Sequence, residues 1–291
     1  MATKGAKLAL GYKKAAWCFS PSPGDGIMNH TMRVFLTICF SILSLHAWPQ
    51  QDTMMVGIGT GWNANMILDE FHSPMPYSGN GYMFQAGLNE QNDRLYDQLA
   101  IIYQKSKISP DVDNNSASHL YSGSINWIRT YRLRGKAEKW SIYLGFHFLT
   151  SYNASSHTNW PNNTYSHCLA FNLGPSLVID YAPWQKDLHF MWELSVPLLN
   201  YIIRPSLGSI VPEGSIRRSR QDFWGFASGG SITSLHEYQR IYSNLFVSYQ
   251  DATRFAVRAG YQWDFQNYTV NNHYRSANHL IYVALYYRFK K

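Results

Sequence analysis

The segment Thr253–Gln266, TRFAVRAGYQWDFQ, alternates between apolar and other residues over its whole length. Every second residue from Phe255 to Phe265 is apolar, and those between are charged, polar or small. A period of two is typical of a β-strand, because successive side chains point to opposite faces of a sheet. The run is longer than an ordinary strand of about five or six residues. It suits a strand with lipid on one face and a polar lumen on the other.

Similar alternation recurs after residue 50 and predicts about ten strands. The expected ranges are 54–65, 81–90, 95–105, 119–134, 139–151, 167–181, 188–204, 235–250, 253–266 and 276–289. Long and short connections alternate between them, which is typical of an outer-membrane barrel with short turns at one end. The predicted fold is therefore an all-β, up-and-down antiparallel transmembrane barrel of about 10 strands, or about 12 if the weakly patterned eighth strand adds a hairpin.

A soluble β-barrel or sandwich would also alternate, but with its apolar face inward. Uniformly bulky apolar faces and unequal connections favour the membrane barrel instead. Two residues suggest local irregularities. Arg129 lies on the apolar face of its strand, which indicates either snorkelling or a shifted register. Pro197 has no backbone N–H and predicts a bulge in the strand 188–204.

The front of the chain carries an export signal. The segment Met32–Gln50 has a basic start, an apolar run and a Leu-His-Ala end, which predicts a signal peptide at 32–47. Residues 1–31 are interpreted as an over-long start or a disordered leader, and 48–291 as a single barrel domain. Five basic residues and one acidic residue precede residue 48, so the net charge falls from +7 to +3. This mild, scattered charge does not indicate nucleic-acid binding.

If the apolar faces meet lipid, the polar faces must pair their charges within the lumen, because unpaired burial is costly. The predicted lumen network is Arg132, His147, Asp180, His189, Glu193, Arg254, Arg258, Asp264 and Arg288. We interpret it as a plug, since a barrel of about ten strands leaves little open channel. A narrow pore for small solutes or a ligand pocket is the alternative. After the leader only Cys168 remains among the cysteines, so no disulfide, metal site or cofactor is expected.

An enzymatic function is a further alternative. His147 and Glu193 with Ser151 are candidates to meet across the lumen, and a second group lies in or beside the expected outer loops: His157, His167, Asp222, His236 and His273. The sequence has no H-E-x-x-H or G-x-S-x-G motif. We therefore assign no catalytic residue and keep a lipid-acting hydrolase as an alternative.

The signal peptide, the near-terminal Phe289 after alternating aromatics, and the segment 195–205 (SVPLLNYIIRP) resemble outer-membrane barrel proteins of Bacteroidota-type bacteria. The resemblance covers roughly residues 50–291 and implies insertion by the barrel-assembly machinery, with Tyr287 and Phe289 as part of the recognition signal. The expected surroundings are outer-membrane lipid and lipopolysaccharide. The basic segment Ser215–Arg220 is interpreted as either a lipopolysaccharide-phosphate contact or a solvated loop, rather than a nucleic-acid site. The expected role is a structural or accessory subunit, in a larger envelope complex.

Overall fold

The computed structural model describes residues 53–70, 73–92, 94–110, 118–133, 139–157, 165–183, 187–204, 230–250, 254–269 and 273–290. The expected leader and signal peptide lie outside these ranges, as do Ser215–Arg220 and Asp222. Within them, no helix is long and apolar enough to cross a membrane.

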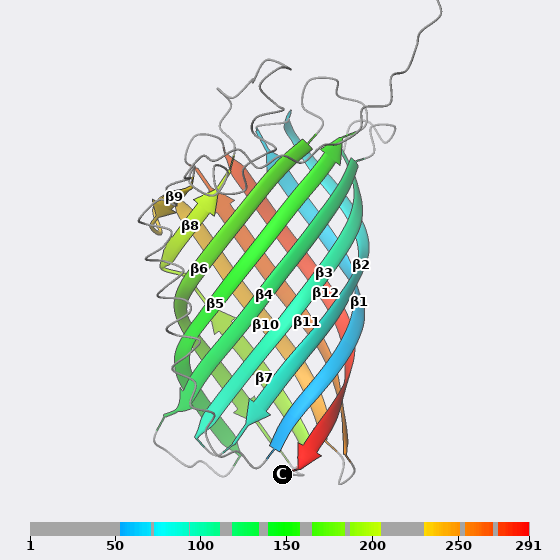
Figure 1. The fold of residues 1–291 in the computed structure, drawn as a ribbon, viewed down its shortest axis with the longest axis vertical. Helices are drawn as coiled ribbons and strands as arrows, with labels where there is room; N and C mark the ends of the chain where they lie inside the picture. The colour runs from blue at the N-terminus through cyan, green and yellow to red at the C-terminus, as the bar shows by residue number, and fades with distance from the viewer. Residues whose placement is uncertain are drawn as a thin grey trace, which may run out of the picture.

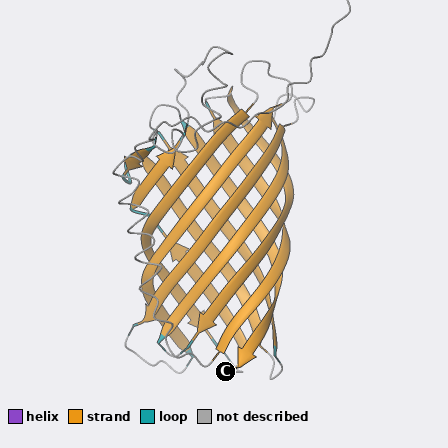
Figure 2. Ribbon diagram, viewed as in Figure 1, coloured by secondary structure: helices purple, strands orange, loops and turns teal. Residues whose placement is uncertain are grey.

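The described residues form twelve strands (Figures 1 and 2). Their bounds are β1 Thr53–Asp69, β2 Ser73–Gln91, β3 Leu95–Pro110, β4 Ser118–Arg132, β5 Trp140–His157, β6 Tyr165–Tyr181, β7 Leu188–Ser195, β8 Leu199–Ile203, β9 Ser231–Thr233, β10 Tyr238–Gln250, β11 Phe255–Tyr268 and β12 Tyr274–Lys290. Ten of them, β1–β7 and β10–β12, pair antiparallel in a closed ring. The predicted barrel is confirmed. We call the end at which β1 begins and β12 ends the lower end (Figure 1).

Strand β11 shows how the alternation is oriented. Phe255, Val257 and Tyr261 are 51, 45 and 42% exposed, whereas Ala256 and Arg258 are 2 and 3% exposed. The apolar residues therefore point outward and the charged ones inward, opposite to a soluble barrel. The same outward apolar surface continues on the neighbouring strands, so the soluble alternative is wrong.

The strands are longer than expected, and this changes the connections. Strand β1 continues to Asp69 and β2 begins at Ser73, so the long loop expected after residue 65 is mostly strand. Strand β5 likewise continues to His157. The connections therefore alternate in length less than predicted. The reason is that polar residues near the upper ends of these strands, beyond the apolar outer surface, still belong to the strands.

Arg129 lies on the outer face, directly opposite Asp97. The pairing of β3 and β4 keeps one register from Leu95↔Tyr131 to Ile108↔Ser118, so no bulge occurs at Arg129. An Arg129–Asp97 ion pair accommodates the charge instead, and the indole of Trp127 donates to Asp97 Oδ1 at 2.9 Å.

Around Pro197 the structure departs from the prediction of one bulged strand. The segment 188–204 is divided into β7 and β8, both paired with β6. Leu198 N still donates to Leu173 O at 3.0 Å, so the segment stays against β6. On the other side β7 pairs with β10, whereas β8 pairs with β9. In the described ranges neither β8 nor β9 pairs with β10, so the extra strands lie outside the ten-strand ring.

The lumen is filled by two apolar layers. The lower layer includes Tyr96, Met191, Phe246, Tyr282 and Tyr286. The upper layer contains side chains near the opposite ends of the strands, among them Tyr77, Ile108, Cys168, Tyr238 and Tyr274. Cys168 is a buried free cysteine in this layer. The polar side chains of the lumen lie within and between these layers.

Candidate functional site: the polar lumen

Glu193 on β7 is the centre of the lower polar network and is fully buried. The hydroxyl of Tyr96, from β3, donates to Glu193 Oε1 at 2.5 Å. The amide of Asn244, from the neighbouring β10, donates to Glu193 Oε2 at 2.7 Å. Because β3 and β7 are separated by several strands in the ring, the carboxylate links two sides of the lumen.

Arg258 on β11 carries the positive charge of this network. Its Nη1 donates to Gln98 Oε1 at 3.0 Å, and Gln98 Oε1 lies 2.5 Å from the Tyr96 hydroxyl. The guanidinium also lies over the rings of Phe246 and Tyr286, 4.0 and 4.8 Å from their centroids. Cation–π contacts of this kind stabilise a desolvated guanidinium. Arg258 and Glu193 are therefore joined through Gln98 and Tyr96, and this network crosses the lumen.

His147 lies at the same level, but it makes no hydrogen bond to Glu193 or Ser151, the residues considered with it for an enzyme. Its Nδ1 lies 2.6 Å from Ser195 Oγ, and its ring packs 4.9 Å from that of Tyr242. Glu193 and Ser151 bond to other side chains, so the His147–Glu193–Ser151 group does not assemble. His147 is fully buried, below the cavity described next.

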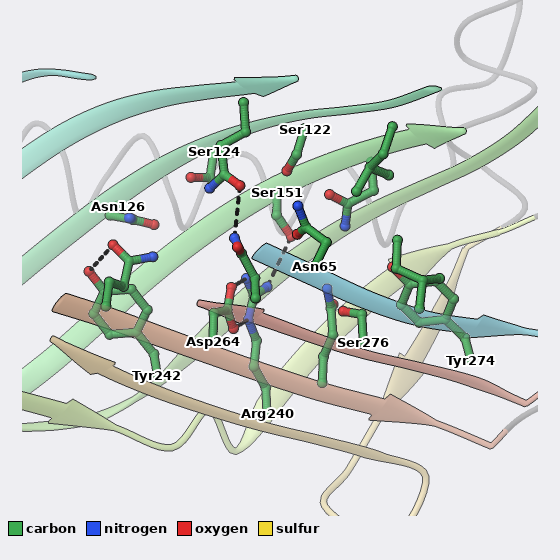
Figure 3. A pocket seen from close by; sticks show the side chains of 17 residues that line it. Asn65, Ser122, Ser124, Asn126, Ser151, Arg240, Tyr242, Asp264, Tyr274 and Ser276 are labelled. Atoms are coloured by element: carbon green, nitrogen blue, oxygen red, sulfur yellow. Dashed lines mark hydrogen bonds and ion pairs between the residues drawn. The ribbon is translucent and has the colours of Figure 1, made fainter. Parts of the chain in front are cut away.

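The second polar level is formed around Arg240 on β10, which sequence reasoning missed (Figure 3). Its Nε and Nη2 donate to the two carboxylate oxygens of Asp264 at 2.9 and 2.5 Å. Its Nη1 donates to Ser151 Oγ on β5 at 2.9 Å. Asp264 was predicted to need a lumen partner, but β10 mixes Tyr and Phe into its inward face and Ser and Gln into its outward face. Its alternation therefore did not show which way Arg240 points.

A polar cavity of about 30 Å³ lies beside this ion pair (Figure 3). Its walls are mostly amide and hydroxyl side chains, and Gln104 Oε1 accepts hydrogen bonds from Asn63 Nδ2 and Asn278 Nδ2 at 2.9 and 2.8 Å. The buried Asn126 also lines it, and its Oδ1 has no hydrogen-bond partner within the described part of the chain. A water needs about 10–15 Å³, so the cavity is sized for a few waters or a very small polar solute.

Other predicted lumen residues make polar contacts at the lower mouth. Asp180 lies 2.9 Å from His189 Nδ1, and its other carboxylate oxygen accepts a hydrogen bond from Gln91 Nε2 on β2 at 2.9 Å. Arg132 donates to Ser141 Oγ at 2.7 Å, and Arg288 donates to Gln250 Oε1 at 2.8 Å. The structure thus distributes the residues of the expected single network over the contacts at the lower mouth, the Glu193 network and the Arg240 level.

Arg254 does not line the lumen. It is exposed and precedes the first residue of β11, so the ladder does not direct its side chain inward. Its Nη1 instead donates at 2.9 Å to the hydroxyl of Tyr287 on the outer face. Tyr287 and Phe289, the expected assembly signal, pack edge to face there with ring centroids 4.9 Å apart.

The upper mouth has an ion pair that was not predicted. Arg204, just after β8, pairs with Asp69 at the end of β1, and Ser166 Oγ donates to the same carboxylate at 3.1 Å. The Arg204 guanidinium lies 4.7 Å from the ring centroid of Tyr274. Within the described ranges, no group of three or more His, Cys, Asp or Glu side chains is arranged to hold a metal ion.

No protein-family model matches the sequence, and a comparison with curated proteins finds no match. Among solved structures, the outer membrane protease OmpT of Escherichia coli is similar with a TM-score of 0.50 and 8% identity, over 82% of this chain and 98% of that chain. The translocator domain of the autotransporter NalP from Neisseria meningitidis matches with a TM-score of 0.40 and 10% identity, over 91% and 100% of the two chains. Neisserial surface protein A gives 0.35 and 10%, over 80% and 97%. The fold is that of an outer-membrane β-barrel protein.

Proposed function

We propose that this protein is an integral barrel of a bacterial outer membrane that does not conduct solutes and acts as a structural or accessory subunit of the envelope. The observation that carries the proposal is the closed lower half of the lumen. There Glu193, Tyr96, Gln98 and Arg258 form a continuous network across the lumen. A lumen blocked at this level by its own side chains has no continuous path for a solute.

The packing around the network supports the same conclusion. Tyr282 donates to Asn244 Oδ1 at 3.0 Å, and Asn244 in turn donates to Glu193. Tyr96, Phe246 and Tyr282 are all almost completely buried at this level. Opening a path would leave buried polar groups without partners, which costs about 1–3 kcal/mol for each group.

Conductance in planar lipid bilayers tests the closed lumen. The wild-type protein should insert without producing conductance steps. A Tyr96→Ala/Phe246→Ala/Arg258→Ala variant should produce them, which also shows that the assay detects inserted protein. Regular steps from the wild type would refute the proposal and favour a narrow pore for small solutes. The polar cavity beside Arg240 is the observation that favours this second candidate.

The accessory role has its own test. Purification from detergent-solubilised envelopes of the native host should recover the barrel with reproducible partner proteins, and recovery of the lone barrel would count against a complex. Export by a signal peptide, Bacteroidota-type origin, insertion through Tyr287 and Phe289, and contact with lipopolysaccharide belong to the same proposal. They are supported by sequence patterns and by the sequence resemblance rather than by the fold.

We do not include hydrolysis in the proposal. OmpT is a protease, but at 8% identity the similarity concerns the fold alone. In this chain the Ser195–His147 contact is closest to a hydrolase arrangement, and both side chains are buried below the polar cavity. A lipid or peptide substrate would not reach them there.

A further inference from the structure

The outer surface of the lower half contains an apolar groove of about 520 Å³. It spans four neighbouring strands, β5, β6, β7 and β10. Its lining includes Trp140, Ile179, Tyr181, Phe190, Trp192 and Leu245. A volume of this size is within the range of about 300–1,000 Å³ that is typical of small-molecule sites.

The strand register explains the shape of the groove. Trp140 lies opposite Tyr181, and Tyr181 opposite Phe190, which forms one row across the strands. Ile179 lies opposite Trp192, and Trp192 opposite Leu245, which forms the next row. The two indoles therefore stand on the strands on either side of β6, and the smaller Ile179 lies between them.

Both indole walls are held in place. Trp140 stacks on Tyr181 with ring centroids 4.2 Å apart and planes 26° apart. The Trp192 Nε1 donates to Ser243 Oγ on β10 at 3.0 Å. Side chains that are already fixed lose little conformational entropy when a ligand binds, so the groove is preorganised.

The surroundings of the groove indicate what occupies it. It lies on the outward apolar surface, beside the exposed Ile142 and Leu144. Lys139 is exposed and lies at the lower edge of the groove. Its backbone carbonyl accepts a hydrogen bond at 2.9 Å from the N–H of Ala182, which precedes the lining residue Pro183. Trp and Tyr are enriched where hydrocarbon meets headgroups, and a basic side chain near that level attracts phosphate.

We propose that the groove is a binding site for one acyl chain of a phospholipid in the leaflet at the lower end, with the phosphate beside Lys139. A protein interface would combine an apolar centre with a polar rim on several sides, whereas here the charge lies at one edge. The site is independent of whether the lumen conducts, and it requires only that the outer surface faces lipid.

Lipid retention tests the site. The refolded, full-length protein is incubated with dioleoylphosphatidylglycerol in mixed micelles, exchanged into lipid-free detergent, and analysed by native mass spectrometry. The wild type should retain one phospholipid molecule. Trp140→Ala and Trp192→Ala should each lower this occupancy about tenfold or more, because each removes an aromatic wall. Trp62→Ala is the matched control, since Trp62 is similarly exposed on β1 but lies outside the groove, and it should retain lipid.

Two further variants keep the test decisive if an alanine variant folds poorly. Leu245→Trp should fill the groove and displace lipid without removing a wall. Lys139→Gln should weaken retention of phosphatidylglycerol while the barrel still migrates as folded protein on unboiled gels. The proposal is overturned if Trp140→Ala and Trp192→Ala both retain lipid as the wild type does, or if Trp62→Ala loses lipid as much as they do. A dimer mass that Trp192→Ala abolishes would instead assign the groove to a second copy of the chain.

Discussion

The ion pair between Arg240 and Asp264 allows a quantitative test of the lumen. Asp264→Leu should destabilise the barrel by about 3–5 kcal/mol, because it leaves a buried guanidinium without its counter-charge. Arg240 would lose its bonds to both carboxylate oxygens and keep those to Ser151 and Tyr238. Hydrogen bonds to charged groups contribute about 1.5–3 kcal/mol each, and the loss of two agrees with this range.

The double variant Arg240→Met/Asp264→Leu separates the effect of an orphaned charge from that of altered packing. Replacing a whole buried pair by apolar side chains is often neutral, so the double variant should recover most of the stability. The free energy of unfolding is measured by urea titration in phospholipid vesicles, followed by tryptophan fluorescence. The reasoning is refuted if Asp264→Leu lowers the free energy of unfolding by less than about 1 kcal/mol. It is also refuted if the double variant loses as much stability as the single variants Arg240→Met and Asp264→Leu lose in sum.

Two further predictions use matched controls. Val283→Arg places a charge on the exposed apolar face of β12. It should destabilise the barrel by up to about 2–4 kcal/mol near the bilayer centre. Gln239→Arg, on the exposed face near the upper end of β10, should be tolerated in the same unfolding assay, and equal losses of stability would mean that the lipid-facing surface is misassigned. Gly57→Ala should lower the yield of heat-modifiable barrel on gels, because a Cβ at Gly57 would lie 2.4 Å from the Tyr286 ring. Gly123→Ala should fold normally, since no atom lies within 4 Å of its added Cβ; equal yields of the two variants would argue against tight packing of Tyr286.

Much of the fold was predictable because a strand between two different environments has apolar residues on one face and polar or small residues on the other. In β11 the residues on one face are apolar and those on the other are polar, charged or small, and this alternation predicted the strand. Its orientation was predicted from the bulky apolar faces and the unequal connections, because a soluble barrel would alternate in the same way. The same rule was weaker for β10, whose inward face includes Tyr242 and Phe246. Aromatic residues inside the lumen resemble aromatic residues facing lipid when only the pattern is considered.

The structure of the 188–204 segment could not be predicted in detail for a different reason. Pro197 indicates that one ladder hydrogen bond is missing, but not which neighbour the chain will then follow. In the structure β8 keeps β6 on one side and takes β9 on the other, while β10 continues with β7 and β11. This choice depends on strands that are distant in the sequence.

For the lumen, the sequence determined which residues face inward on the clearly alternating strands, and therefore that Glu193, Arg258 and Asp264 would need partners. Only the tertiary structure decided which partners they have. Tyr96 reaches Glu193 across 97 positions of sequence, and Gln98 reaches Arg258 across 160. The direction of a side chain follows from the local period of two, because successive side chains of a strand point to opposite faces of the sheet. The partner across the lumen follows from ring closure and register, which bring together strands that share no local pattern.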